Sequence, residues 1–306
     1  MPLQQITKPA SSQTPMLEAG GHDTELQTLY AGVKNAFREA GLPTPDLDAR
    51  LLVTETLGVS TAQLIANPRR KIPPDLAREL QDKAKARLAG QSIGRILGRR
   101  AFWSLDLRVS AHTLEPRPET ETVVELALSA LADIAPPALI ADLGVGTGAI
   151  LLAILSERLD ARGVGIDVSQ PALREAARNA ERHNLADRTL FVAGDFGASL
   201  APVFDLVVSN PPYIATADIE QLDATVRDYD PRVALDGGRD GLDCYRTVFQ
   251  QAESMLKRSG QLIVEIDPRA HDAVVEEADR HGLIHLASAD DLSGRKRAVA
   301  LGAPRT

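Results

Sequence analysis

The chain has 306 residues, of which 44% are hydrophobic and 25% are charged, and its formal net charge at pH 7 is −8. This length and composition indicate a globular protein with two domains. No apolar run approaches the length of a membrane span, so no membrane partner is expected. The six histidines are scattered without metal-ligand spacing, which argues against a metal site. The single Cys244 cannot form an internal disulfide and fits a reducing cytoplasm.

The charge is distributed unevenly along the chain. Residues 1–22 are rich in Gln, Ser, Thr and Pro and are predicted to be a disordered leader. Residues 1–114 carry 15 Lys and Arg against 11 Asp and Glu, whereas residues 115–306 carry 19 against 31. Ten of the basic residues lie from Arg69 to Arg100, which indicates either a partner-binding surface or a solvated helix face. The acidic second part argues against stable binding to nucleic acid.

A small helical domain is predicted over residues 23–90. Its expected helices run over about 25–40, from a cap at Asp46 to Gly58, from Ser60 or Thr61 to Asn67, and from Pro73-Pro74 to Gly90. Residues 91–114 are predicted to form a linker that contains a hairpin, because apolar residues partly alternate from Phe102 to Val109.

From residue 115 to 306, strand and helix patterns alternate, which indicates a mainly parallel sheet with helices on both faces. The expected strands are 139–143, 163–167, 189–195, 204–209, 261–266, 284–287 and 298–301, and the expected helices include 148–158, 170–183, 245–258 and 270–281. The last two strands are joined by too few residues for a parallel crossover, so they are predicted to form an antiparallel hairpin. The predicted fold class is therefore α/β, with a seven-stranded, mostly parallel Rossmann-like sheet whose last strand is antiparallel.

The most informative stretch is Asn210-Pro211-Pro212-Tyr213, which follows the apolar strand at 204–209. Two prolines remove two backbone donors, so the strand must stop at Asn210. In open α/β sheets, ligands bind at the carboxyl ends of the strands. The Asn210 side-chain oxygen and the Pro211 carbonyl can accept both hydrogens of a planar NH₂ group, on which the Tyr213 ring can stack. This arrangement suits the transfer of a group onto an amide or amino nitrogen.

A glycine-rich loop ends the first strand of the sheet and opens a helix. Dinucleotide-binding enzymes use Gly-x-Gly-x-x-Gly, whereas here Gly144, Gly146 and Gly148 alternate with Val145 and Thr147 after an acid, Asp142. That acid would repel a pyrophosphate and attract a cation. S-adenosylmethionine carries an ammonium and a sulfonium and has no phosphate, so the loop favours this cofactor over NAD.

Two further acids are expected at the ends of the next two strands. Asp167 can accept both ribose hydroxyls of a nucleoside, and Asp195 with Phe196 can bond an adenine amino group and cover the ring. The candidate cofactor-binding residues are therefore Asp142, Gly144, Val145, Gly146, Thr147, Gly148, Asp167, Asp195, Phe196 and Asn210.

Taken in this order, the motifs resemble a class I S-adenosylmethionine-dependent amino or amide methyltransferase. Pro116-Arg117-Pro118-Glu119-Thr120-Glu121 narrows the resemblance to the HemK-like release-factor glutamine methyltransferases. Further matching segments are Arg50-Leu51-Leu52, Ile96-Leu97-Gly98, Phe102-Trp103, Leu235 to Leu242 and Asp291 to Arg295. The resemblance covers most of residues 25–302 and is most specific in the second domain.

The resemblance implies methylation of the side-chain amide of the glutamine in the Gly-Gly-Gln motif of a peptide chain release factor. It implies cofactor contacts at Gly144 to Gly148, Asp167, Phe196 and Asn210, and a glutamine held by Asn210, Pro211, Pro212 and Tyr213. Asn210, Pro211 and Tyr213 are the candidate catalytic residues. The helical domain would bind the release factor, and a cytoplasmic monomer is expected.

Some residues depart from the family pattern, namely Ser92, Gly94, Arg95, Glu115, Asp230 and Asp267. Since these residues lie in the linker and near strand ends, a paralogue with another protein target is an alternative. A DNA adenine methyltransferase is a second alternative, because the same tetrapeptide can grip an exocyclic amino group. A nicotinamide oxidoreductase is disfavoured by the glycine spacing, and a non-enzymatic adaptor is disfavoured by the intact motifs.

Overall fold

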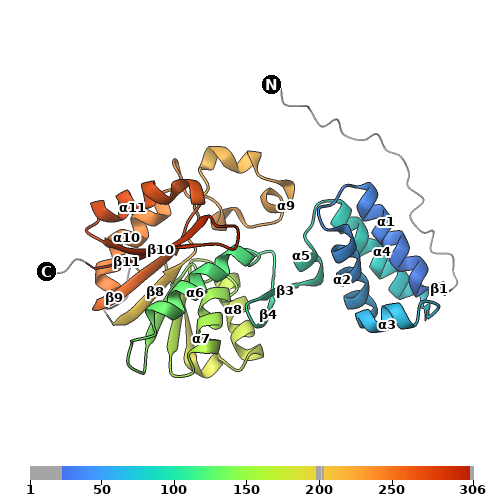
Figure 1. The fold of residues 1–306 in the computed structure, drawn as a ribbon, viewed down its shortest axis with the longest axis horizontal. Coiled ribbons are helices and arrows are strands. Elements are labelled where there is room, and N and C mark those ends of the chain that lie inside the picture. Colours follow the sequence, from blue (N-terminus) through green and yellow to red (C-terminus); the bar gives the residue numbers. More distant parts are fainter. Residues whose placement is uncertain (1–22, 198–200, 202, 304–306) are drawn as a thin grey trace. The chain divides into compact units, whose positions relative to one another are not determined.

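The computed structural model describes residues 23–197, 201 and 203–303 (Figure 1). Internal contacts divide the chain into two compact units, Met1–Leu97 and Gly98–Thr306. The leader predicted over residues 1–22 lies outside the described residues. Within the segment predicted as a linker, residues up to Leu97 belong to the first unit and those from Gly98 onward belong to the second.

The described part of the first unit is a set of short helices around one apolar core. The helices are α1 (Leu26–Glu39), α2 (Pro45–Leu57), α3 (Thr61–Ala66), α4 (Pro74–Leu88) and α5 (Ile93–Leu97). Two short strands, β1 (Thr24–Glu25) and β2 (Lys71–Ile72), pair antiparallel. The core includes the fully buried Phe37, Leu52 and Leu80.

Most of the predicted ends of these helices are confirmed. Ser60 caps α3 through a reciprocal pair of hydrogen bonds with Gln63, and Gly58 ends α2 in the left-handed region at φ 60°. The prediction that Asp46 caps α2 is wrong, because Pro45 already opens the helix and the Asp46 carboxylate pairs with Arg38 at 2.6 Å.

Part of the basic stretch from Arg69 to Arg100 serves the first unit itself. Arg87 is buried and its Nε donates to Asp48 Oδ2 at 2.8 Å, which ties α4 to α2. Lys83 pairs with Glu79 one turn earlier on α4, at 2.7 Å. Helix α5 was not predicted, and Ser92 begins it by accepting a hydrogen bond from the Arg95 backbone N–H at 3.2 Å.

The second unit is built on a seven-stranded sheet, which confirms the predicted fold class. The strand order is β10-β11-β9-β8-β5-β6-β7, and β11 alone is antiparallel to its neighbours. The strands are β5 (Leu139–Leu143), β6 (Arg162–Asp167), β7 (Thr189–Ala193), β8 (Phe204–Ser209), β9 (Leu256–Glu265), β10 (Ile284–Asp290) and β11 (Lys296–Gly302). The hairpin predicted within residues 91–114 is also present, as β3 (Arg99–Phe102) and β4 (Leu105–Arg108).

Helices cover both faces of this sheet (Figure 1). Helices α6 (Glu121–Ala130), α7 (Ala149–Glu157) and α8 (Gln170–Arg182) pack on one face, and α10 (Asp243–Met255) and α11 (His271–Arg280) pack on the other. Side chains alternate along β5, so that Ile140 joins the core under α7 whereas Ala141 and Leu143 join the core under α10. Helix α10 ends earlier than predicted because Leu256 already pairs with Phe204 of β8.

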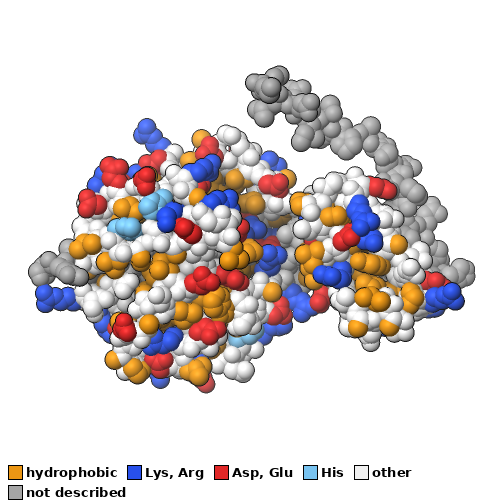
Figure 2. All heavy atoms as spheres, in the orientation of Figure 1, with side chains coloured by type: hydrophobic (Ala, Val, Ile, Leu, Met, Phe, Trp, Pro, Cys, Tyr) orange, Lys and Arg blue, Asp and Glu red, His pale blue; other side chains and the backbone are white. Residues whose placement is uncertain are grey.

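Within the described residues, no helix combines the length and apolar character that a membrane crossing requires. On the face of residues 98–303 shown in Figure 2, Lys and Arg side chains are interspersed with Asp and Glu. The net negative charge of this unit is therefore not gathered into one acidic patch on that face.

Candidate functional site

The corner at Asn210 is held beside the glycine loop by the pairing of two central strands. Leu143 of β5 and Ser209 of β8 are in register, and the buried Ser209 hydroxyl donates to the Leu143 carbonyl at 2.7 Å. Gly144 follows Leu143 and Asn210 follows Ser209, so both residues lie at the same edge of the sheet. The Asn210 side chain forms no hydrogen bond with any other described residue, which leaves its amide available to a ligand.

The spacing of the glycine loop follows from its backbone. Gly144, Gly146 and Gly148 have φ values of 75°, 55° and 84°, in the left-handed region that strains other residues. The backbone N–H groups of Gly144 and Val145 both donate to the Ile166 carbonyl at 2.9 Å, which turns the loop over the end of β6. Three of the five residues 144–148 are left-handed, and this is why glycines alternate in the loop. The turn therefore differs from that of the dinucleotide loop.

Asp167 ends β6 and holds this loop with its carboxylate. Its Oδ2 accepts the Gly146 N–H at 2.9 Å, and its Oδ1 accepts the Ser169 N–H at 2.8 Å. A carboxylate has about four lone-pair sites, so each oxygen can accept one more hydrogen bond. The residue is thus fixed in orientation and can still accept the two hydroxyls of a ribose.

Asp142 is 1% exposed and lies in the wall of the same cavity. Its Oδ2 accepts the Leu151 N–H at 3.2 Å, and its Oδ1 has no hydrogen-bond partner among the described residues. Burial raises the pKa of this carboxyl to about 7, although the Leu151 N–H opposes the rise, and nearby Asp167 adds to it. A buried acid with an unpaired oxygen is stabilised by a cationic ligand, which fits S-adenosylmethionine.

Asp195 and Phe196 lie just beyond the third strand. Strand β7 ends at Ala193, two residues before the predicted end, so both residues belong to a loop on the cavity wall. Phe196 has φ 48°, an uncommon backbone for a residue other than glycine. Its Cε1 lies 4.0 Å from the position of a Cβ on Gly144, so the ring lies beside the glycine loop.

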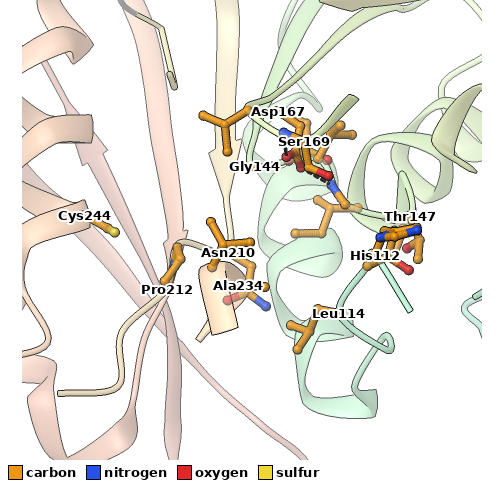
Figure 3. A pocket seen from close by; sticks show the side chains of 18 of the residues that line it. His112, Leu114, Gly144, Thr147, Asp167, Ser169, Asn210, Pro212, Ala234 and Cys244 are labelled. Atoms are coloured by element: carbon orange, nitrogen blue, oxygen red, sulfur yellow. Dashed lines mark hydrogen bonds between the residues drawn. The ribbon is translucent and has the colours of Figure 1, made fainter. Parts of the chain in front are cut away.

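These residues enclose a cavity of about 500 Å³. Figure 3 shows Asn210 and Pro212 in the middle of the view, with Cys244 on one side and Thr147 and His112 on the other. Of the predicted site residues, the wall contains Asp142, Gly144, Val145, Gly146, Thr147, Asp167, Asp195, Phe196, Asn210 and Pro212. Gly148 directly precedes α7 and lies in the chain between the wall residues Thr147 and Ala149.

Pro211 and Tyr213 are not part of the cavity wall. Pro211 is buried, and Tyr213 is half-buried against the core that lies under α10. The Tyr213 hydroxyl donates to Glu265 Oε1 at 3.4 Å, and burial raises the pKa of this phenol well above its usual range. The predicted stacking of Tyr213 on a substrate amide therefore stays a prediction.

A glycine-rich turn packs against the proline corner and fixes its course. The Ile214 N–H donates to the Leu235 carbonyl at 3.0 Å, and the Gly237 N–H donates to the Ile214 carbonyl at 2.8 Å. A Cβ on Gly237 would lie 2.8 Å from the Pro212 carbonyl oxygen, so only glycine permits this approach.

Comparisons with known proteins agree with this geometry. The family model described as "PrmC N-terminal domain" matches residues 28–98, and that described as "Methyltransferase small domain" matches residues 122–227. The release factor glutamine methyltransferase of Rhodospirillum rubrum is 43% identical over 263 residues, covering 86% of this chain and 80% of the relative. The chain belongs to the release factor glutamine methyltransferase family. Its relative in Bradyrhizobium diazoefficiens is 47% identical over 231 residues, covering 75% of this chain and 78% of the relative.

A solved structure shows that the fold is shared more widely. A methyltransferase from Pyrococcus furiosus superimposes with a TM-score of 0.50 at 15% identity, covering 73% of this chain and 99% of that chain. The family membership confirms the predicted resemblance, methyltransferase activity and S-adenosylmethionine cofactor, and the solved structure agrees with the predicted fold.

Several cavity residues were not among the predicted site residues. Pro116 and Arg117 were quoted only as part of the family motif, and Cys244 was considered only for its lack of a disulfide partner. The other unpredicted wall residues are His112, Thr113, Leu114, Thr120, Ala149, Ile150, Val168, Ser169, Gly194, Val233, Ala234 and Asp236. Arg117, Thr120 and Asp236 could have been found from the quoted family segments, but Val233 and Ala234 carry no local signal.

Asn179 of α8 is a second omission. It is fully buried, and its Nδ2 donates to the Thr147 carbonyl at 2.9 Å and to the Arg108 carbonyl at 3.1 Å, while its Oδ1 accepts the Arg108 N–H at 2.8 Å. One amide thus ties the glycine loop to the β3–β4 hairpin. The available signal was an amide flanked by Ala176 and Ala180 on the apolar face of a helix.

Two departures from the family pattern, Glu115 and Asp230, belong to one network beside the cavity. Arg117 pairs with the buried Asp230 at 2.5 Å, and Asp230 also accepts the Glu115 N–H at 3.4 Å. The buried Glu115 carboxylate pairs with Arg100 at 3.5 Å. Asp267 has a local role instead, because it caps the turn Pro268–Ala270.

Cofactor affinity is expected to rise between pH 6 and pH 8. At the lower pH the Asp142 carboxyl is mostly protonated, and at the higher pH it is ionised and attracts a cation, so affinity should increase by up to about tenfold. Calorimetry at several pH values would measure this change. Asn at position 142 cannot ionise, so Asp142→Asn should flatten the profile; an equally steep profile in that variant would show that Asp142 is not the cause.

Proposed function

We propose that this methyltransferase transfers a methyl group from S-adenosylmethionine to the side-chain amide nitrogen of the glutamine in the Gly-Gly-Gln motif of a peptide chain release factor. Relatives named release factor glutamine methyltransferase match most of the chain at 43% and 47% identity. The observation that carries the proposal is the position of Asn210 and Pro212 on the wall of the cavity that the glycine loop and Asp167 also form.

The residues present fit the cofactor. Asp167 would accept its ribose hydroxyls, and Asp195 and Phe196 would contact the adenine. Asp142 offers an unpaired carboxylate oxygen to its positive charge. When bound, S-adenosylmethionine supplies a methyl group activated by the sulfonium.

An amide nitrogen is a poor nucleophile because its lone pair is delocalised. The Asn210 side-chain oxygen and the Pro211 carbonyl would accept hydrogen bonds from the two N–H groups of the substrate amide. These hydrogen bonds increase the electron density on the nitrogen and favour its pyramidal form. Two consecutive prolines and the packing of Gly237 on Pro212 keep this corner rigid, so much of the gain is orientation. After the methyl transfer the nitrogen is positively charged, so one of its N–H protons is acidic and can pass to water. No general base is therefore required before the transfer.

The domain assignments follow from the same proposal. Residues 23–90 would bind the release factor, with residues 91–114 as linker and residues 115–306 as the methyltransferase domain. The basic side chains between Arg69 and Arg100 that are exposed would take part in this contact. We further propose that the protein acts as a monomer in the cytoplasm and does not bind nucleic acid stably, in keeping with its single cysteine and acidic second unit.

Mass spectrometry of a purified release factor incubated with the enzyme and S-adenosylmethionine tests the function directly. One methyl group on the Gly-Gly-Gln peptide is the expected result. A methyl group on another protein of a lysate, with none on the release factor, would support the paralogue. Filter binding and methylation of duplex DNA would support the adenine methyltransferase, and no cofactor consumption with any substrate would support the adaptor.

Replacing Asp167 by Ala is expected to weaken cofactor binding. The change removes the proposed ribose acceptors and also the acceptor of the Gly146 N–H, so affinity for S-adenosylhomocysteine should fall by about 10²-fold. Calorimetry measures this loss. Asp187→Ala, an exposed acid in the turn Ala186–Arg188, is the matched control, and equal affinity in both variants would contradict the ribose role.

A further inference from the structure

Behind the proline corner, the buried carboxylate of Glu265 accepts a hydrogen bond from Tyr213 and lies in the electrostatic range of two further segments. Glu265 is the last residue of β9 and is 2% exposed. The Tyr213 hydroxyl donates to its Oε1 at 3.4 Å. Two further neighbours, the Thr120 hydroxyl and the Arg297 guanidinium, are close enough to favour its ionised form.

Burying the Glu265 carboxyl lowers the stability of the folded protein. Burial raises the pKa of the Glu265 carboxyl to about 7, although Thr120, Arg297 and Tyr213 oppose the rise. Among the described residues, Glu265 Oε2, Thr120 Oγ1 and Arg297 Nε have no hydrogen-bond partner. A buried polar atom without a partner costs about 1–3 kcal/mol, and an apolar side chain at position 265 would avoid that cost. Such a cluster is typical of functional sites rather than of structural cores.

Each neighbour of Glu265 belongs to a segment that matters for the site. Tyr213 ends the proline corner, and Thr120 ends the turn Pro118–Thr120 and lines the cavity. Arg297 of β11 pairs with the buried Asp291 at 3.2 Å. The carboxylate therefore lies where the corner, the cavity wall and the Asp291 to Arg295 segment meet.

We propose that Glu265 is a positioning residue for methyl transfer, which holds Tyr213 through its hydroxyl and thereby fixes the Asn210 corner at the cavity. This inference rests on the proposed function and adds a residue to it. Glu265 does not line the cavity, so it acts through Tyr213 and not on the substrate.

The charge of Glu265 matters for this role. An ionised carboxylate accepts a phenol hydrogen bond more strongly than a protonated one. The pKa of the Glu265 carboxyl is about 7, so the corner should be held more firmly above this pH than below it. The other charged or titratable groups that face Glu265 and Tyr213 are Arg297, Glu119, Asp267 and Tyr245, and the Tyr245 hydroxyl donates to the Glu265 backbone carbonyl at 2.7 Å.

Steady-state kinetics of release-factor methylation by the full chain tests this proposal. Glu265→Ala is expected to lower kcat by about 10- to 100-fold, because small displacements of a reacting group have effects of this size, and to change KM and cofactor affinity by less than about threefold. Glu265→Gln keeps a hydrogen-bond acceptor of the same shape and should recover most of this loss. The wild-type kcat should rise through pH about 7, and Glu265→Gln should remove that rise. Glu119→Gln, which changes the neighbouring acid, should keep it.

A double-mutant cycle with Tyr213→Phe separates positioning from general packing. If Glu265 acts through the Tyr213 hydroxyl, the double variant Tyr213→Phe/Glu265→Ala should be no slower than Glu265→Ala alone. Multiplicative losses, or a wild-type kcat in a folded Glu265→Ala variant, would overturn the proposal. Absence of release-factor methylation by the wild-type enzyme would instead reject the proposed function, so the two failures are distinguishable.

Discussion

Asn210→Ala is expected to lower kcat for release-factor methylation by about 10²–10³-fold. The Asn210 amide lies on the cavity wall and forms no hydrogen bond with other described residues, so its loss leaves no buried partner unsatisfied. It removes an acceptor that is oriented toward the substrate nitrogen as this atom attacks. The melting temperature should therefore change little, and the loss should appear in the chemical step.

A radiolabelled cofactor and single-turnover conditions measure this step directly. Asn35→Ala, which removes the same amide from an exposed position on α1, serves as the matched control and should keep the wild-type rate. An unchanged single-turnover rate in Asn210→Ala would remove Asn210 from the mechanism. A similar loss in both variants would point to a general effect on the protein.

Gly237→Ala is expected to damage both stability and activity. The new Cβ would lie 2.8 Å from the Pro212 oxygen, 2.8 Å from the Tyr213 Cα and 2.9 Å from the Tyr213 carbonyl carbon. All three atoms are backbone, so no side chain can move aside. We expect a loss of about 1–3 kcal/mol, which corresponds to a decrease of roughly 2–10 °C in the melting temperature of the second unit. Displacement of the corner should lower kcat by about 10²-fold.

Scanning calorimetry and the methylation assay measure these two effects. Gly294→Ala is the control, because Gly294 has φ 75° but no heavy atom within 4 Å of the new Cβ. It should show the cost of a left-handed alanine, about 1–2 kcal/mol, and leave kcat unchanged. A Gly237→Ala variant with wild-type kcat would show that the turn does not fix the proline corner.

The strands and their order in the chain were predictable because their signals are local. Strands β5 and β8 have the predicted bounds, since apolar runs there end at a glycine loop and at a proline pair. Ends that depend on pairing were less predictable. Strand β9 begins at Leu256 because this residue pairs with Phe204, a contact that no local pattern indicates. Helix α5 was missed for a related reason, since it is only five residues long.

The candidate site divides in the same way. Asp142, Asp167, Asp195 and Asn210 were found from the sequence because parallel strands bring their carboxyl ends to one edge, so position along each strand predicts position in space. Cys244 and the wall residues at 233–236 reach the cavity through loops and helix packing, which that rule does not cover. The direction in which Tyr213 points could not be predicted either, because its neighbour Glu265 lies 52 residues away.

The sequence by itself determined the fold class and the cofactor, and it narrowed the acceptor to an amide or amino nitrogen. Each of these depends on short-range properties, namely side-chain periodicity, a left-handed glycine loop beside an acid, and a strand ended by two prolines. Only the tertiary structure decided that Asn179 ties the glycine loop to the hairpin and that Tyr213 donates to Glu265 behind the proline corner. Such contacts depend on how buried side chains share a limited interior, and that is a property of the whole packed unit.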